Sequence, residues 1–405
     1  VIPSSLADTP CASLGVQGAL DQLNATLGTS HTLDTPSVLS LLEECIEKNY
    51  DFGTVYGRSR MVWNTYRDSN MEDGLRRYEE EDREKRQAAL VGDRIINPRL
   101  DPRRLWDLPI SHAWVDEEDR VDVLTPINGY EWPVPIPRDA NLNLIRIEML
   151  NLGVEYMRLD VLCLRQKEGL REDLRAEEWK LDVPTIGYIY WEFRVVVYLS
   201  GLGQPLSLKE GDLESNQCWF QQAWTVQEVG FKGRIIAGNM PDGPMHAEAI
   251  DNNGNYKTDM LTRFHKKMKS LHRKRDIFSV LAAMQDRVLT NSMDRVAGLA
   301  QPMRPRAIPA YYESRSLEDA WTALVNTTHN LQRALLLFQY PGVRLGCKKW
   351  RPTWDQVMME SLPAYINWFG EVHHDDKTDE DRFDGHCIEK GLLHGLDVGS
   401  AEGDD

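Results

Sequence analysis

Residues 218–230 read CWFQQAWTVQEVG and are the most informative stretch of the chain. Their pattern predicts a short amphipathic helix that begins after Ser215 and ends at Gly230, because glycine tolerates the left-handed conformation beyond a helix C-terminus. Trp224 and Glu228 are four residues apart, so they would lie on one face of this helix. A carboxyl group beside indole rings is partly desolvated, which raises its pKa and suits it to acid–base chemistry. We therefore expect the functional site around Glu228.

Around this stretch the sequence alternates between strand-like and helix-like segments. Apolar runs predict buried strands at residues 108–114, 156–164, 195–199 and 234–238. Helical spacing of apolar residues predicts intervening helices at residues 141–152 and 179–193, the second kinked or split by Pro184. Strands separated by helices join through right-handed crossovers. The predicted fold class is therefore α/β, a mainly parallel sheet flanked by helices.

The chain divides by composition into four parts. Residues 1–104 are predicted to be a helical N-terminal extension, with an exposed, charged helix over residues 71–91. Residues 105–240 hold the α/β core, and residues 241–370 form a helical C-terminal part. Residues 371–405 carry 12 acidic and 3 basic side chains, so we expect a flexible tail or a weakly packed appendage there.

The overall charge and the cysteine pattern exclude several classes of protein. The 405 residues carry a formal net charge of -16, which argues against wholesale binding to nucleic acid or to an anionic membrane. No apolar run approaches the roughly 20 residues needed to span a bilayer, and residues 1–8 do not resemble a signal peptide. The six cysteines are scattered without a CxxC pair, which is typical of reduced thiols in a cytoplasmic protein.

Candidate site residues gather where the strands end. Ligands of open parallel sheets bind beyond the carboxyl ends of the strands. The loops that meet there, together with the stretch around Glu228, contain the candidate substrate-binding residues Ser111, His112, Trp114, Asp160, Arg165, Ser200 and Trp224.

Each of these side chains also has a structural interpretation. Glu228 could cap or salt-bridge a helix end, and His112 could donate to a backbone carbonyl that locks its strand. Trp114 could belong to the core, and Asp160 could be a polar anchor near the site. Cys163 fits a buried thiol better than a nucleophile.

Two histidine- or lysine-rich segments suggest no separate site. The basic run 263–275 lacks the interleaved aromatic residues of a nucleic-acid site and is interpreted as a solvated helix face. His373, His374, His386 and Cys387 fit no metal-ligand spacing, so no metal is predicted.

Three blocks of the sequence resemble a known family when taken together. They are SHAW at residues 111–114, YMRLDVLCLRQ at 156–166 and AWTVQE at 223–228. They resemble, in order, the blocks SHxWG, YLWIDALCIDQ and RAWTLQE of the fungal heterokaryon-incompatibility (HET) domain. Residues 294–300, DRVAGLA, are similar to the weaker DxxYxLLGL block that often follows. The resemblance covers roughly residues 105–300 and implies a role in fungal self/non-self recognition or cell-death signalling.

The resemblance extends to a fold and a candidate reaction. HET domains are similar to the Toll/interleukin-1 receptor (TIR) fold, a flavodoxin-like sheet. Some TIR domains cleave NAD, with a catalytic Glu in a WCxxE motif on the helix after the third strand. Trp224 and Glu228 have the same spacing. The resemblance thus implies Glu228 as the catalytic carboxylate, NAD or a related nucleotide as substrate, no cofactor, and self-association or a signalling partner. The alternative is a non-catalytic module that acts through protein contacts.

Three positions depart from the family blocks. Val115 stands where the family has Gly, Arg165 where it has Asp, and Gln222 where it has Arg. The chain therefore lacks a second carboxylate at position 165, and at position 222 it lacks the Arg that could bind an anionic ligand. Arg165 or Arg158 would have to replace that Arg.

Overall fold

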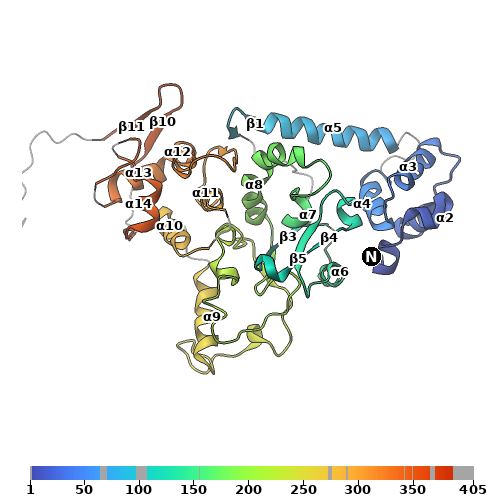
Figure 1. Ribbon diagram of the computed structural model, residues 1–405, viewed down its shortest axis with the longest axis horizontal. Coiled ribbons are helices and arrows are strands. Elements are labelled where there is room, and N and C mark those ends of the chain that lie inside the picture. Colours follow the sequence, from blue (N-terminus) through green and yellow to red (C-terminus); the bar gives the residue numbers. More distant parts are fainter. Residues whose placement is uncertain are drawn as a thin grey trace, which may run out of the picture.

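The computed structural model describes residues 2–63, 71–96, 107–154, 156–271, 276–288, 291–341, 343–348, 350–364 and 370–385 (Figure 1). Its α-helices are α1 Ser4–Ala7, α2 Cys11–Leu27, α3 Pro36–Glu47, α4 Phe52–Trp63, α5 Met71–Ala89, α6 Leu142–Asn151, α7 Asp160–Cys163, α8 Arg175–Glu192, α9 Asp259–Ser270, α10 Ile277–Gln285, α11 Met293–Leu299, α12 Leu317–Thr327, α13 Asn330–Gln339 and α14 Trp354–Met359. Its strands are β1 Leu90–Val91, β2 Arg94–Ile95, β3 Asp107–His112, β4 Arg120–Val123, β5 Val134–Pro137, β6 Tyr156–Leu159, β7 Val195–Tyr198, β8 Arg234–Ile236, β9 Ile308–Pro309, β10 Val372–Asp375 and β11 Glu380–Phe383.

A parallel sheet forms the centre of the described chain. Its four strands are ordered β6-β3-β7-β8, and every pairing within it is parallel. This arrangement confirms the predicted α/β class. Pro109 is tolerated in the central strand β3 because β7 pairs with β3 only from Ile110 onward, so Pro109 has a strand neighbour on one side only.

Alternating residues of β7 build a core on each face of the sheet. Val195 and Val197 pack with Tyr190 of α8 and Phe264 of α9 on one face. Val196 and Tyr198 pack on the other face, with the apolar side chains of α6 and β5. Because side chains alternate along a strand, a strand covered on both faces is apolar throughout, as β7 is.

Hydrogen bonds fasten the covering helices to the strands. The Tyr190 hydroxyl donates to the carbonyl oxygen of Ile110 at 2.8 Å, which joins α8 to β3. Glu148 of α6 accepts from the Tyr198 hydroxyl at 2.5 Å and from the Gly238 amide at 2.8 Å. The predicted helices at 141–152 and 179–193 are confirmed as α6 and α8, and Pro184 lies inside α8 without splitting it.

The predicted helix over residues 215–230 is wrong. The segment contains only two short 3-10 turns, Trp219–Gln221 and Trp224–Val226. Its main-chain groups bond to partners that a helix would not use. The Val288 amide donates to the Gln221 carbonyl oxygen, and the Ala223 amide donates to the Val288 carbonyl oxygen. The Thr225 hydroxyl donates to the carbonyl oxygens of Trp219 and Gln222. Gly230 does adopt the left-handed conformation, with φ 73°. These competing bonds prevent the helical pattern from forming.

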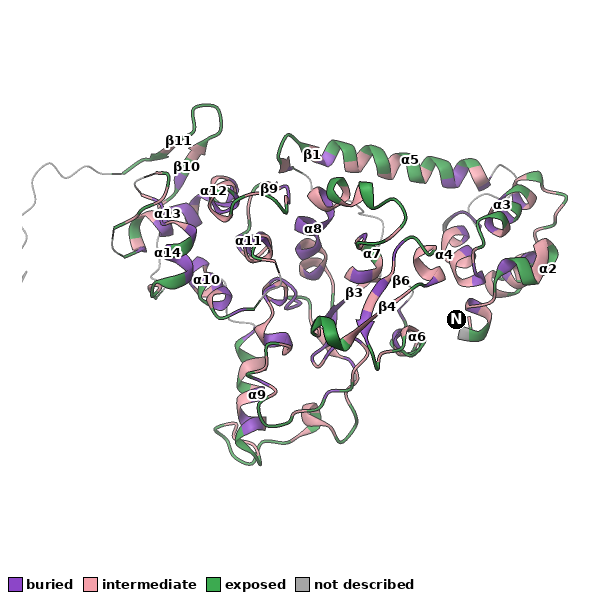
Figure 2. Cartoon of the chain, in the orientation of Figure 1, coloured by how far each residue is buried: buried purple, intermediate pink, exposed green. Residues whose placement is uncertain are grey.

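The N-terminal helices have a core of their own. Apolar side chains of α2, α3 and α4, among them Leu23, Leu41 and Trp63, are buried together. As predicted, α5 is a charged helix; its ends are buried and its middle is largely exposed (Figure 2). It leads into β1 and β2, and β2 pairs with β9 of the C-terminal part.

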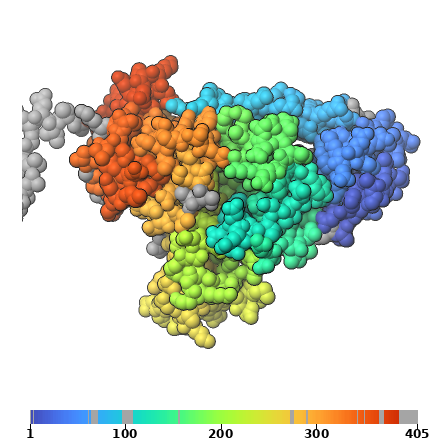
Figure 3. All heavy atoms as spheres, viewed as in Figure 1, coloured from blue at the N-terminus to red at the C-terminus, as the bar shows by residue number. Residues whose placement is uncertain are grey.

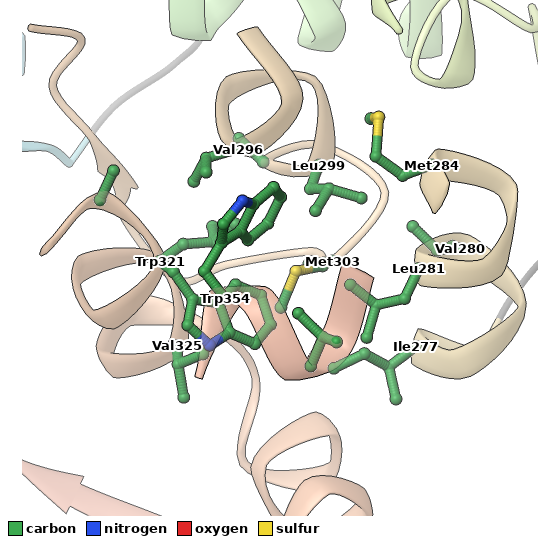
Figure 4. Close-up of a cluster of buried hydrophobic side chains, with 14 of the residues drawn as sticks. Ile277, Val280, Leu281, Met284, Val296, Leu299, Met303, Trp321, Val325 and Trp354 are labelled. Carbon is green, nitrogen blue, oxygen red and sulfur yellow. The ribbon is translucent and has the colours of Figure 1, made fainter. Parts of the chain in front are cut away.

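The C-terminal helices enclose a further apolar core (Figure 4). Trp321 of α12 and Trp354 of α14 lie 5.9 Å apart between ring centroids at its centre. Side-chain caps begin these helices, with Ser316 accepting from the Asp319 amide before α12 and a Thr353–Gln356 capping box before α14.

The expected flexible tail is partly wrong. Residues 372–383 form the antiparallel hairpin β10–β11, and residues 386–405 lie outside the described part of the chain. The hairpin is held by Asp381, a buried carboxylate that accepts from Lys348, Trp350 and Arg351. In the described residues, no helix has the length and apolarity needed to cross a bilayer.

Close packing of Gly187 in α8 gives a test of this fold. A Cβ atom at position 187 would lie 2.1 Å from Oε1 of the buried Gln227 and 2.8 Å from Cβ of Gln301. We expect Gly187→Ala to lower the free energy of unfolding by about 1–3 kcal/mol through overpacking. Gly57→Ala in α4 is the control, because nothing lies within 4 Å of the added atom. It should leave stability unchanged or raise it by about 0.5–1 kcal/mol. Urea unfolding of both variants measures the contrast, and equal effects would contradict the packing.

Candidate functional site

The carboxyl ends of the parallel strands bring several predicted residues to one edge. Ser111 and His112 end β3, and Asp160 directly follows β6. The prediction that Asp160 lies inside a strand is therefore wrong, because the strand stops at Leu159 and Asp160 begins α7. Ser200 follows β7 at the same edge and is partly buried, but no hydrogen bond between described residues joins it to the others.

Glu228 lies beside Ser111 in the interior. Its side chain is 7% exposed, and its Oε2 atom accepts from the Ser111 hydroxyl at 2.5 Å. The same hydroxyl accepts from the indole nitrogen of Trp219 at 2.7 Å. Ser111 thus connects the end of β3 to both ends of the segment 219–228. Glu228 neither caps a helix nor forms an ion pair with another described residue.

Burial controls the charge state of Glu228. Desolvation raises the pKa of its carboxyl group to about 7, and the hydrogen bond from Ser111 opposes this increase only in part. The negative charge of Asp160 raises the pKa further, and His112 lowers it. A carboxyl group with a pKa near neutrality can hold or release a proton under ordinary conditions.

His112, which is buried, and Asp160, which is half-buried, form a second pair. His112 Nε2 lies 2.9 Å from Asp160 Oδ1, and the Trp114 indole donates to Asp160 Oδ2 at 3.2 Å. The rings of His112 and Trp114 stack with centroids 5.6 Å apart. Burial opposes charge on both members of the pair, but their attraction raises the pKa of His112 and lowers that of Asp160. The His–carboxylate pair joins β3 to the start of α7.

Gln222 explains one departure from the HET blocks. Its Oε1 atom accepts from the Trp114 amide at 2.7 Å, and its Nε2 atom donates to the Trp114 carbonyl oxygen at 2.5 Å. An Arg side chain carries no acceptor, so it could not make the first of these bonds. Gln222 is therefore matched to the backbone opposite it, and this position offers no cation to an anionic ligand.

Arg287, in the C-terminal part of the chain, stabilises the segment 219–228 through hydrogen bonds. It is 7% exposed, and its Nη1 atom donates to the Thr225 hydroxyl at 2.5 Å and to the Gln222 carbonyl oxygen at 3.0 Å. Burial lowers the pKa of Arg287 to about 10. Sequence reasoning missed this residue, because no motif surrounds it.

Two predicted site residues bond to partners other than Glu228. Arg165 forms ion pairs with Glu178 at 2.9 Å and Glu131 at 2.9 Å, so it is not free to replace an anion ligand. The Trp224 indole donates at 3.0 Å to Asp294, which also accepts from the Tyr311 hydroxyl at 2.8 Å. Burial raises the pKa of Asp294 to about 6.

The remaining predictions have mixed outcomes. Cys163 is exposed, so its prediction as a buried thiol is wrong. The described part of the basic run forms α9 up to Ser270, and residues 272–275 lie outside the described part. Within the described residues, no cluster of three or more His, Cys, Asp or Glu side chains could hold a metal ion.

Sequence reasoning also overlooked side chains that complete the site. Trp219 lies within residues 218–230, and Asp294 lies in the HET-like block at residues 294–300, but the sequence patterns predicted no role for either. Ser111, His112 and Glu228 at this edge are 1%, 5% and 7% exposed, and the clefts of about 400 and 30 Å³ elsewhere in the described chain contain none of them. Glu228 can hold a proton, and the hydrogen bonds of the edge join the three HET-like blocks to one another. The buried side chains Ser111, His112 and Glu228 offer little surface to a substrate.

Comparisons of the chain with family models, with curated proteins and with solved structures give no match.

The raised pKa of Glu228 predicts a pH-dependent stability. Between its ordinary value of 4.5 and about 7, the folded protein keeps a proton that the unfolded chain has lost. Stability from this group is therefore fully present below pH 4.5 and decreases as the pH rises through 7. The slope is at most about 1.4 kcal/mol per pH unit. Glu228→Gln should remove this slope and be more stable than the wild type at pH 8.

Melting temperatures measured between pH 5 and pH 8.5 test this expectation. Glu43→Gln is the matched control, because it makes the same chemical change at an exposed position of α3. Parallel curves for the wild type and Glu228→Gln would show that Glu228 is ionised in the folded protein throughout.

Proposed function

We propose that this chain is a HET-domain protein of fungal self/non-self recognition or cell-death signalling, with a TIR-like, flavodoxin-like sheet as its core. One observation supports this proposal above the others. The blocks that resemble the family are the parts that hydrogen-bond to one another: Ser111 to Glu228, His112 and Trp114 to Asp160, and Trp224 to Asp294.

The burial and the mutual bonding of these side chains favour a non-catalytic module. Glu228 is 7% exposed, and its oxygen is engaged by Ser111. His112 and Asp160 satisfy each other, and Arg165 is paired with Glu131 and Glu178. These side chains stabilise the sheet edge through mutual bonds, so signalling would proceed through contacts with a second copy or a partner protein.

Cleavage of NAD or a related nucleotide at the N-glycosidic bond is the second candidate. It is favoured by the pKa of Glu228, about 7, at the carboxyl edge of a parallel sheet. In that reaction the carboxylate would stabilise the oxocarbenium-like ribose as nicotinamide leaves, or accept a proton from water. The edge would have to open for a nucleotide to reach Glu228.

Nicotinamide release separates the two candidates. Concentrated wild-type protein and Glu228→Gln are incubated with NAD, and nicotinamide is followed by chromatography. A non-catalytic module predicts that neither protein exceeds the rate in buffer. Release by the wild type that Glu228→Gln lowers by about a hundredfold or more would establish the enzyme instead.

Inducible expression in a filamentous fungus tests the signalling role. We expect the wild type to reduce viability and Ser111→Ala to lose the effect, because the variant breaks the bond between the first and third blocks. Ser270→Ala, at the exposed end of α9, should behave as the wild type. Normal growth while intact wild-type protein accumulates would contradict the proposal.

A further inference from the structure

A polar cleft of about 400 Å³ lies away from the sheet edge, where the β1–β2 turn meets β9 and α12. Its polar lining includes Asp93, Arg94, Arg315, Asp319, Thr322 and Asn326. Its volume is within the range of about 300–1,000 Å³ that is usual for small-molecule sites. The β10–β11 hairpin (red in Figure 3) lies against the end of the α5–β2 arm (cyan) beside it.

Two guanidinium groups of the cleft are held by exposed carboxylates. Arg315 Nη2 lies 2.6 Å from Asp93 Oδ2, and Arg94 Nη1 lies 2.5 Å from Asp376 Oδ2 of the hairpin. The carboxylate side chains are 58% and 56% exposed. Exposed ion pairs of this kind contribute about 0.2–1 kcal/mol, so a ligand with a stronger anion can replace the carboxylates. Arg315 is also oriented by the Tyr312 ring, 4.6 Å below its guanidinium carbon.

Additional positive charge lies directly behind the cleft. Arg333 is 2% exposed, and it donates to the carbonyl oxygen of Asn326 at 2.8 Å. Its other donors reach the carbonyl oxygens of Val325 and Val372 and the side-chain oxygen of Asn330, all of them neutral groups. No carboxylate of the described residues bonds to Arg333 directly, and the charges of Asp381 and Asp376 act on it from a greater distance. Its positive charge favours an anion in the cleft, because the local dielectric constant is low.

Acceptors for hydroxyl groups complete the cleft. The Oδ1 atom of Asn326 is buried and has no hydrogen-bond partner among the described residues. Asp319 is exposed, and one of its carboxylate oxygens accepts from the Ser316 hydroxyl. Thr322 adds a hydroxyl group whose described contact is a weak one, with Cys347 Sγ at 3.7 Å. Carboxylate and amide oxygens of this kind recognise sugar hydroxyls.

We propose that this cleft binds a small phosphate monoester that carries sugar hydroxyls, of the size of a nucleoside monophosphate. The phosphate group replaces the rim carboxylates on Arg94 and Arg315, whose planar guanidinium groups can each donate two hydrogen bonds to it. The sugar hydroxyls donate to Asn326 and Asp319. The cleft contains no residue of the Glu228 cluster, so the inference does not depend on the proposed function.

Calorimetric titration of the full chain with adenosine 5′-monophosphate tests the proposal. We expect saturable binding that Arg94→Gln and Arg315→Gln each weaken by about tenfold or more. Arg83→Gln is the control: it removes the same charge from an exposed ion pair with Glu80 on α5 and should bind as the wild type does. If Arg315→Gln does not fold, Arg315→Lys takes its place. This variant keeps the charge but loses the bidentate geometry, so it should also weaken binding.

Several outcomes would overturn the proposal. They are no saturable binding of the monophosphate, unchanged affinity in folded Arg94 and Arg315 variants, and binding of adenosine as tight as that of its monophosphate. Inorganic phosphate that binds as tightly as the nucleotide would also overturn it, because the sugar hydroxyls would then contribute nothing. Nicotinamide release from NAD has no bearing on any of these results.

Discussion

The hydroxyl group of Ser111 is the contact on which the centre of the molecule depends. It donates to Glu228 and accepts from Trp219, so it joins the end of β3 to the segment that leads into β8. A buried carboxyl group or indole N–H without a partner costs about 1–3 kcal/mol, which makes departures from this arrangement unfavourable. The path of residues 219–228 is constrained accordingly.

A second set of bonds connects this edge to the C-terminal helices. Arg287 and Val288 take main-chain groups of the segment, and Asp294 accepts from Trp224. Because these partners come from beyond residue 280, the sheet edge and the C-terminal core depend on each other. Buried polar groups that are all hydrogen-bonded favour a single conformation of the chain, because any other conformation would leave some of them without a partner in the low-dielectric interior.

The two charged regions of the molecule differ in their relation to solvent. At the sheet edge, His112 and Glu228 are buried, and Asp160 is half-buried and bonded to His112 and Trp114. At the cleft, the ion-pair partners of Arg94 and Arg315 are carboxylates that solvent reaches. Buried charges cost desolvation energy, so they restrict the fold to the arrangement that gives them partners, whereas solvent-accessible charges remain open to exchange with a ligand.

Local patterns in the sequence determined α6, α8 and the positions of the four strands of the parallel sheet, because hydrophobic periodicity reports which faces are buried. They also placed Ser111 and His112 at the carboxyl edge of the sheet and Glu228 in the segment that follows a neighbouring strand, because carboxyl ends of parallel strands coincide. Tertiary structure alone decided that residues 219–228 are not helical, that Trp224 turns to Asp294, and that Arg165 pairs with Glu131 and Glu178. These outcomes depend on partners distant in sequence, such as Arg287, whose bonds outweigh local helical preference and leave no periodic signal in the chain.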